Sequence, residues 1–337
     1  MPGEQLSLFD ASHEPQAEPP AADAAPDSVS GVDLSRARAL TPRTRLSSAM
    51  EAYRDHMVAR RFSENTVKAF MYDLDLVAEF FTSAKPIGEI AHRDLERFID
   101  WLVTGRGVPC NPKSLARRIT TLKAFFGWLA ESGAIPVDPA APIIHQPVRT
   151  PLPDILFDNE VDAVLAATQR LRTGVTADAD SPPKPDERPH LLVTLLLSTG
   201  IKKSECVAIK LEHIDRSDPD EPVLWIRYAD ARHRHKERKL RLDRNWPKLL
   251  DAYLAQYEIK DTVFPWSARM LEYVLADVGT MAGLSKPLSF ETLRWTCAVR
   301  DKRGGMPDEA LRRKLGLSTI TWREAGEKLA KLTAPAL

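Results

Sequence analysis

The chain has few cysteines, no long apolar run and no excess of charge of either sign. Its three cysteines, Cys110, Cys206 and Cys297, are widely separated and form no C-x-x-C pair, so we expect neither a disulfide framework nor a zinc site. No apolar stretch approaches the roughly 18 residues of a membrane span, and no charged-then-apolar leader opens the sequence. These features predict a protein of the reducing cytoplasm, without metal, cofactor or membrane association.

Tyrosine and histidine are missing from the C-terminal part of the chain. None of the six tyrosines follows Tyr273, and no histidine follows His235. A phenol that acts as a nucleophile must be supplied by a tyrosine, and no shift of alignment can create one in a segment that has none. Covalent catalysis by a tyrosine in the last helices is therefore not expected.

Charge is balanced over the whole chain but not along it. Lysine plus arginine equal aspartate plus glutamate at 47 each, while residues 1 to 40 hold seven acidic residues against Arg36 and Arg38. The remaining chain is therefore mildly basic. Residues 1–44 are rich in alanine, proline and acidic residues, and their few large apolar side chains predict a disordered tail. One compact exception is the sequence Q-L-S-L-F, which contains Gln5, Leu6, Leu8 and Phe9.

Apolar residues recur at three- to four-residue spacing from residue 45 to residue 135, which predicts a helical bundle. We expect four helices near residues 46–57, 64–81, 92–104 and 113–132, with Ser63 as an N-cap. Pro136, Pro139, Pro142 and Pro147 indicate a linker over residues 136–150.

Residues 151–337 are predicted to form an α+β domain with one strand pair, residues 223–228 and 238–242, joined by a basic connection. An insertion rich in aspartate and proline is expected at residues 173–189. The expected helices lie near residues 159–172, 190–198, 246–257, 267–283, 290–302, 308–315 and 321–332. The predicted fold is thus mainly helical, with a small sheet in the second domain.

Three motifs of this domain resemble those of the tyrosine site-specific recombinases, which include the phage integrases and the Xer proteins. The segments are T-G-I-K-K-S-E-C at 199–206, E-T-L-R-W-T at 291–296 and L-G-L-S-T-I at 315–320. In the family the corresponding boxes read T-G-L-R-x-S-E-L, H-x-L-R-H-T and L-G-H-S-S-I. The first domain likewise resembles the family's core-binding, SAM-like domain at residues 62–67 and 122–129. The resemblance implies a helical core-binding domain followed by a domain of the recombinase catalytic type.

The resemblance also implies a site in which most catalytic positions hold another residue. Lys202 replaces the first phosphate-binding arginine, which keeps the charge but loses the planar, bidentate grip of a guanidinium. His233 lies where the hairpin lysine is expected if Lys236-Glu237-Arg238 is aligned with the family's K-x-R, and Lys236 is the alternative. Both alignments remain open.

The remaining catalytic positions depart further from the family pattern. Glu291 puts a carboxylate where the family has a histidine, and this charge would repel a phosphate. Arg294 alone matches outright. Leu317 replaces a later histidine, and Gly326 falls where the nucleophilic tyrosine follows the third box by about two helical turns. Together these changes predict a site without strand-cleaving activity.

Basic residues that would contact duplex DNA are retained in both predicted domains. Phosphate contacts supply most of the affinity in DNA binding and depend on lysine and arginine. The alternative is a solvated charged face without a partner. The candidate contacts are Lys113, Arg117, Arg118, Lys123, Lys202, Arg232, Arg234, Lys236, Arg238 and Arg294.

The leading hypothesis is a DNA-binding protein of this family that is catalytically inactive and acts in recombination or integration. It would assemble with itself or with an active paralogue, and a tyrosine donated by such a partner would still leave Glu291 and Lys202 unexplained. The N-terminal peptide Gln5, Leu6, Leu8 and Phe9 resembles sequences that dock on the bacterial sliding clamp, which would recruit the protein to replicating DNA. The alternatives are an active recombinase with altered chemistry and a protein-interaction module that no longer binds DNA.

Overall fold

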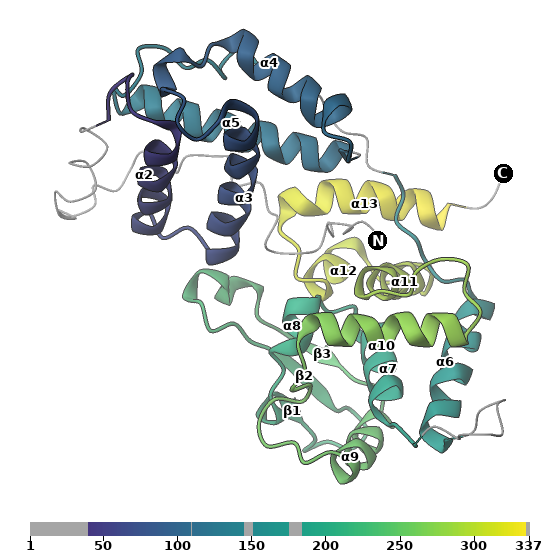
Figure 1. The fold of residues 1–337 in the computed structure, drawn as a ribbon. Coiled ribbons are helices and arrows are strands. Elements are labelled where there is room, and N and C mark those ends of the chain that lie inside the picture. Colours follow the sequence, from purple (N-terminus) through teal and green to yellow (C-terminus); the bar gives the residue numbers. More distant parts are fainter. Residues whose placement is uncertain (1–39, 109, 145–150, 175–183, 335–337) are drawn as a thin grey trace. The chain divides into compact units, whose positions relative to one another are not determined.

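The computed structural model describes residues 40–108, 110–144, 151–174 and 184–334. These residues form two compact units, divided between Pro151 and Leu152 (Figure 1). The clamp-like peptide with Gln5, Leu6, Leu8 and Phe9 lies outside the described residues. No helix among the described residues is both long and apolar enough to cross a bilayer.

The first unit is a helical bundle whose helices begin where local signals predict. Its main helices are α2 (Leu46–Ala59), α3 (Glu64–Phe81), α4 (His92–Asp100) and α5 (Pro112–Glu131), with a short 3₁₀ turn η2 at Ile87–Glu89. The Ser63 hydroxyl accepts a hydrogen bond from the Thr66 backbone N–H at 3.1 Å, so the predicted N-cap of α3 is confirmed. The core is aromatic, and the rings of Tyr53 and Phe125 meet edge to face at 5.3 Å.

Two segments of this unit differ from the sequence prediction. The helix expected to reach residue 104 ends at Asp100 and continues as one π-helical turn, η3 (Trp101–Gly105). Within this turn the Thr104 hydroxyl donates to the Asp100 carbonyl at 2.8 Å, a side-chain bond that the spacing pattern does not encode. Ala140 and Ile143, which fall in the expected linker, are buried in the core of this unit.

The second unit is helix-rich with a small sheet. Its helices are α6 (Asp158–Thr173), α7 (Arg188–Thr199), α8 (Lys203–Val207), α9 (Trp246–Gln256), α10 (Ala268–Met281), α11 (Phe290–Arg303), α12 (Asp308–Lys314) and α13 (Thr319–Thr333). The strands are β1 (Ile214–Asp215), β2 (Val223–Ile226) and β3 (Arg238–Arg241), in the order β1-β2-β3 and antiparallel throughout. The 3₁₀ turns are η4 (Leu211–His213) and η5 (Ala231–Lys236).

The predicted fold class, mainly helical with a small antiparallel sheet, is confirmed. In the register of the strand pair, Leu224 opposes Leu240, so one face of the sheet enters the core. Strand β1 was not predicted, because two residues are too few to show an alternating pattern. The connection between β2 and β3 is the 3₁₀ turn η5 and not a simple hairpin turn.

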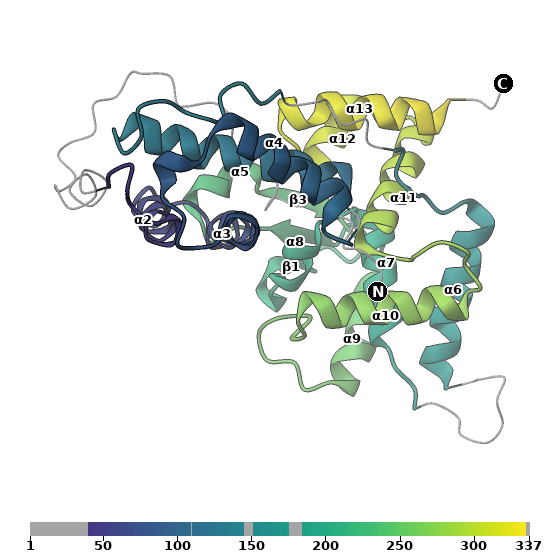
Figure 2. The same ribbon diagram turned by 45° about the horizontal axis from the view of Figure 1, so that its top comes forward.

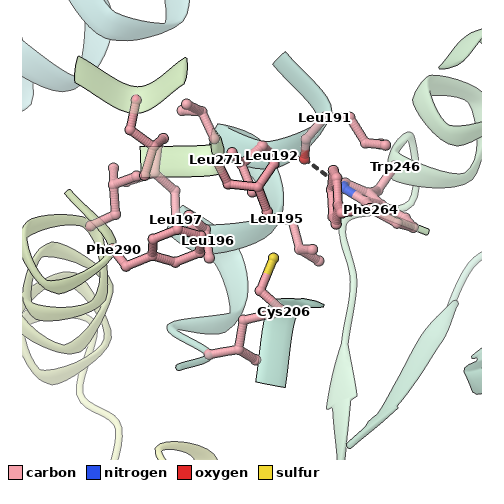
Figure 3. Packing of buried hydrophobic residues seen from close by; sticks show 14 of the residues in the cluster. Leu191, Leu192, Leu195, Leu196, Leu197, Cys206, Trp246, Phe264, Leu271 and Phe290 are labelled. Carbon is pink, nitrogen blue, oxygen red and sulfur yellow. Dashed lines mark hydrogen bonds between the residues drawn. The ribbon is translucent and has the colours of Figure 1, made fainter. Parts of the chain in front are cut away.

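Helix α7 forms the centre of the second unit and is apolar except for one stripe of half-buried polar residues, His190, Thr194 and Ser198. Leucines 191, 192, 195, 196 and 197 are buried against α6, α9, α10 and α11. Figure 3 shows these leucines between Phe290 on one side and Trp246 on the other, with Cys206 below them, and the Trp246 indole donates to the Leu191 carbonyl at 3.4 Å. The motif at 199–206 begins at the C-terminal end of this helix, so its first residues are anchored in the core of the unit.

Candidate functional site

Glu205 is the centre of a buried cluster built from the predicted motif segments. It lies on α8, directly after the turn that Gly200 makes in the left-handed conformation at φ +59°. Its two carboxylate oxygens accept from Arg238 Nη1 and Nη2 at 2.9 Å each, and Oε2 accepts from the Lys202 backbone N–H at 2.8 Å. Burial opposes ionisation, but the attraction and hydrogen bonds of Arg238 outweigh it and lower the pKa of Glu205 to about 2.

Arg238 connects this carboxylate to the third motif. Its Nε donates to the Lys314 carbonyl at 2.7 Å, at the end of α12. The chain then turns at Gly316 with φ +60°, and a Cβ added there would lie 2.6 Å from Arg238 Nη1. The turn therefore requires glycine both for its backbone conformation and for the approach of the guanidinium.

Arg294 is turned toward the backbone and is only 2% exposed. Helix α11 begins after Ser289, whose hydroxyl accepts from the Thr292 N–H, and this cap aims Arg294 into the unit. Arg294 Nη1 donates to the Gly200 carbonyl, and Nη2 donates to the Leu315 carbonyl at 2.5 Å. These carbonyls stand at the C-terminal ends of α7 and α12, where the helix leaves acceptors without an intrahelical donor. Burial lowers the pKa of Arg294 to about 10, so the side chain remains charged.

Lys202 and Lys236 add two buried ammonium groups to the cluster, at 6% and 8% exposure. Burial, followed by repulsion from Arg294, lowers the pKa of Lys202 to about 8. Within the part of the chain that the structure describes, no hydrogen-bond or ion-pair partner accepts from the Lys202 ammonium.

The two candidates for the hairpin lysine occupy different surroundings. Lys236 is buried and its charge acts on Lys202. His233 lies on the same 3₁₀ turn, with its ring 5.8 Å from that of Tyr228. The geometry favours Lys236 as the member of the cluster.

Tyr228 is the tyrosine that touches the cluster, and its hydroxyl donates to Glu205 Oε1. Burial, together with the negative charge of Glu205, raises the pKa of this phenol above its usual value. A phenolate nucleophile requires the opposite shift. Tyr228 thus acts as a hydrogen-bond donor to the carboxylate.

The three other predicted site residues, Glu291, Leu317 and Gly326, lie on or between α11, α12 and α13. Glu291 is half-buried and its Oε1 accepts from the Trp295 indole N–H at 3.3 Å. Leu317 is buried in an apolar cluster with Trp295, α12 and α13. Gly326 lies within α13, one turn after Trp322, whose indole is its nearest neighbour.

The predicted basic stripe of the first unit is partly used inside that unit. Arg117 Nη1 donates to Asp73 Oδ2 at 2.7 Å, and Arg118 is buried with its Nε 3.7 Å from Asp73 Oδ1. Burial raises the pKa of Asp73 despite the two arginines. The prediction of one solvent-facing stripe therefore differs from the structure, because Asp73 draws two of its members inward. Lys113 and Lys123 are half-buried, and Lys123 Nζ donates to the Ala141 carbonyl at 3.2 Å.

The basic connection between β2 and β3 is only partly exposed, because Lys236 is buried and Arg238 at its end is half-buried. Arg232 and Arg234 are exposed, and Arg232 pairs with Asp230 at 2.7 Å. The cation of Arg227, directly after β2, lies 4.9 Å from the ring centroid of Trp225, and that of Lys239 on β3 lies 4.1 Å from it. In the described parts of the chain no group of three or more histidine, cysteine or acidic residues is placed to hold a metal ion.

Comparison with known proteins shows which proteins the chain is similar to. The family "Phage integrase, N-terminal SAM-like domain" matches residues 50–133. Tyrosine recombinase XerC from Roseiflexus sp. (strain RS-1) is 30% identical over 173 residues, which are 50% of this chain and 51% of that protein. Tyrosine recombinase XerD from Listeria monocytogenes serovar 1/2a (strain ATCC BAA-679 / EGD-e) is 23% identical over 292 residues, 82% of this chain and 92% of that protein. The chain is thus similar in sequence to tyrosine recombinases.

A solved structure of a lambda integrase dimer bound to a COC′ core site has the same fold as this tyrosine recombinase homologue, with a TM-score of 0.63 at 15% identity. The similarity covers 83% of this chain and 77% of that one. The match to the Roseiflexus protein spans about half of that protein's length. The predicted fold, with a SAM-like domain followed by a recombinase-type domain, is thus confirmed.

Sequence reasoning on this recombinase homologue found the motif segments but missed two residues of the cluster. Glu205 and Tyr228 were not predicted as site residues, although Glu205 lies in the first motif. The sequence contains Glu205 in the first motif and Arg238 after the basic connection, but nothing in it indicates that the two side chains form an ion pair. Their meeting depends on the packing of α8 against the sheet, which spacing along the chain does not reveal.

Proposed function

We propose that this protein binds duplex DNA without cleaving it and acts in recombination by occupying or pairing its sites. The observation that carries the proposal is Gly326 on α13, at the position where the family's nucleophilic tyrosine is expected. No tyrosine follows Tyr273, and Tyr228 donates its hydroxyl to a carboxylate. A covalent 3′-phosphotyrosyl intermediate therefore has no nucleophile in this chain.

The contacts within the surrounding cluster support the absence of cleavage. Arg294 and Arg238 satisfy backbone carbonyls and Glu205, so neither guanidinium is directed toward an outside phosphate in this conformation. Stabilising the transition state needs donors already aimed at the developing charge. The exposed Arg234 and the half-buried Lys113 can contact the phosphate backbone of DNA. Such contacts do not require the exact placement that catalysis does.

The duplex-binding part is tested by titrating a labelled 40-base-pair duplex at increasing salt. We expect an affinity that falls steeply as salt is raised, because each phosphate contact releases a counterion. Arg234→Gln should weaken binding of all sequences about equally and reduce the salt dependence, whereas Lys260→Gln, an exposed lysine outside the basic connection, serves as the control. No binding at low salt would favour the alternative of a protein-interaction module.

The non-cleaving part is tested with duplexes that carry a nick near the exchange position, selected from a random pool by the protein itself. An active recombinase would trap itself covalently on such a duplex, and the adduct would survive denaturation. We expect a shifted complex in native gels and no adduct in denaturing gels. A denaturation-resistant adduct would establish the alternative of an active recombinase with altered chemistry.

Assembly and recruitment form the finer part of the proposal. We infer that the protein pairs with itself or with an active paralogue, and the lambda integrase neighbour, solved as a dimer on its core site, supports this. The peptide with Gln5, Leu6, Leu8 and Phe9 would bring the complex to the sliding clamp in the cytoplasm. Mapping genomic occupancy for the wild type and a Leu6→Ala, Phe9→Ala variant tests recruitment, which predicts loss of replication-linked signal in the variant.

A further inference from the structure

We propose that the outer face of the small sheet is a docking surface for an acidic, proline-containing segment of this same chain, residues 13–20. The face is centred on Trp225, and the segment reads H-E-P-Q-A-E-P-P. The segment lies outside the described residues, so its chemistry and its distance along the chain identify it as the occupant. The inference does not rest on DNA binding.

The two faces of the sheet carry different kinds of side chain. Successive residues of a strand point to opposite faces, and one face enters the core. Its residues on β2 and β3 are Leu224, Ile226 and Leu240, all buried. On the opposite, outer face Trp225 opposes Lys239, and Val223 opposes Arg241. Both cations are exposed and the indole is half-buried, so this face presents an aromatic ring among positive charges.

The cations beside Trp225 have no counter-charge within ion-pair distance. The Arg227 guanidinium lies 4.9 Å and the Lys239 ammonium 4.1 Å from the ring centroid. Among the described residues, neither cation forms an ion pair with a carboxylate. Hydrogen bonds from Ser217, followed by the charge of Lys239, lower the pKa of Asp215 on β1, so that carboxylate is already engaged. The face can therefore accept further carboxylates beside the ring.

Glutamate followed by proline is the chemistry that suits this face. A proline ring is apolar and its extended backbone is preformed, so proline-rich segments dock on aromatic side chains at low entropic cost. In the segment, Glu14 precedes Pro15 and Glu18 precedes Pro19. Each pair places a carboxylate next to the ring that packs on the indole. There the carboxylate can accept charge-assisted hydrogen bonds from the flanking cations.

Charge and chain length both favour an occupant from this part of the chain. Residues 1 to 40 hold seven acidic residues against two arginines, whereas the remaining chain is mildly basic. Residues 21–39 separate Pro20 from Leu40, where the described chain begins, and these 19 residues span up to about 65 Å. A compact unit of roughly 190 residues is about 40 Å across, so this connection is long enough to pass over one.

A spin label placed in the segment tests the inference in the full chain. Gln16→Cys in a Cys110→Ser background carries the label, because Cys206 and Cys297 are buried and should not react. The probe is the indole N–H signal of Trp225 in protein labelled with ¹⁵N-tryptophan, assigned with Trp225→Phe. We expect this signal to lose most of its intensity to paramagnetic broadening, and the other six indole signals to lose far less. Raising the salt should restore it, since the contacts are exposed and charged.

Paired charge variants separate this segment from the other acidic residues near it. The double variant Glu14→Gln, Glu18→Gln should abolish the broadening. The double variant Asp23→Asn, Asp27→Asn removes the same charge outside the Glu-Pro pairs and should keep it. No selective broadening of Trp225, or equal loss in both double variants, would overturn the inference. Broadening that appears only when spin-labelled chains are mixed with ¹⁵N-labelled chains would assign the segment to a second copy and would also overturn it.

Duplex DNA is the rival occupant of this face, and adding it separates the inference from the proposed function. A duplex that shifts the Trp225 signal, in a protein whose spin label never broadens that signal, would assign the face to DNA. This result would reject the inference and leave the proposed function standing. Selective broadening of Trp225 in a protein that binds no duplex would support the docking surface and reject the proposed function.

Discussion

The two terminal nitrogens of Arg238 donate to the two carboxylate oxygens of Glu205, at 2.9 Å each. The pair is buried, with the Arg238 side chain 9% exposed and that of Glu205 1% exposed. It joins β3 to α8. The stability of the whole cluster therefore depends on this ion pair remaining intact.

Replacing the carboxylate should destabilise the second unit strongly. Glu205→Ala leaves Arg238 buried without its counter-charge, and breaking a buried pair in this way costs about 3 to 5 kcal/mol. We expect a clear loss of free energy of unfolding in urea titration. Arg241 lies on the same strand as Arg238 and forms a solvent-exposed pair with Glu221. Arg241→Gln breaks that pair and should change stability little. Equal effects of the two variants would contradict the importance of the buried pair.

Lys202 should give the protein an alkaline rise in stability. Its pKa is lowered on folding from 10.5 to about 8, so between these values the unfolded state binds more protons than the folded state. Stability therefore increases as the pH rises from 8 to 10.5. Removing the charge in Lys202→Met should increase the free energy of unfolding at pH 7 by up to about 3 kcal/mol and flatten this rise.

Urea titrations at pH 7, 8.5 and 10 in chloride buffer measure this effect. Lys260→Met should retain the slope of the wild type, because Lys260 is exposed. If Lys202→Met is less stable than the wild type at pH 7, the ammonium has a stabilising partner that these contacts do not show.

Restoring a tyrosine alone should not restore cleavage. In Gly326→Tyr the new Cβ would lie 3.4 Å from the Trp322 ring, an ordinary contact, so α13 should tolerate the substitution. Glu291 and Leu317 would still stand where the family has histidines that support proton transfer and bind the phosphate. We expect no covalent adduct on nicked duplexes with Gly326→Tyr, and none with Gly326→Tyr, Glu291→His. An adduct from the first variant would mean that the missing nucleophile is the main defect.

Gly316 offers a test of how tightly Arg238 is held. Gly316→Ala introduces a Cβ 2.6 Å from Arg238 Nη1 in addition to the strain of φ +60°, and we expect a loss well above 1 kcal/mol. Gly283→Ala is the matched control, because Gly283 has φ +69° but no atom within 4 Å of the added Cβ. Melting curves of the two variants separate the cost of the backbone from the cost of displacing the guanidinium.

The sequence was informative where a local signal determines the structure. The apolar spacing of α5, the cap at Ser63 and the strand pair of β2 with β3 each follow from short-range patterns. The direction of a long side chain is decided by contacts distant in the sequence. Arg118 carried the same signal as Lys113, yet Asp73 on another helix draws it into the core. For the same reason the motifs located Arg294 but not the carbonyls to which it donates.

The side chain of Arg294 joins the last turn of α7, 94 residues away in the sequence, to the last turn of α12, 21 residues away. The guanidinium of Arg294 thus connects all three motif segments, which are separate in the sequence. We therefore expect the amides at these two helix ends to exchange through a shared opening event instead of fraying independently. Arg294 matches the arginine of the family motif, but in this structure its side chain connects two helix ends. Its presence is therefore no sign that the protein cleaves DNA.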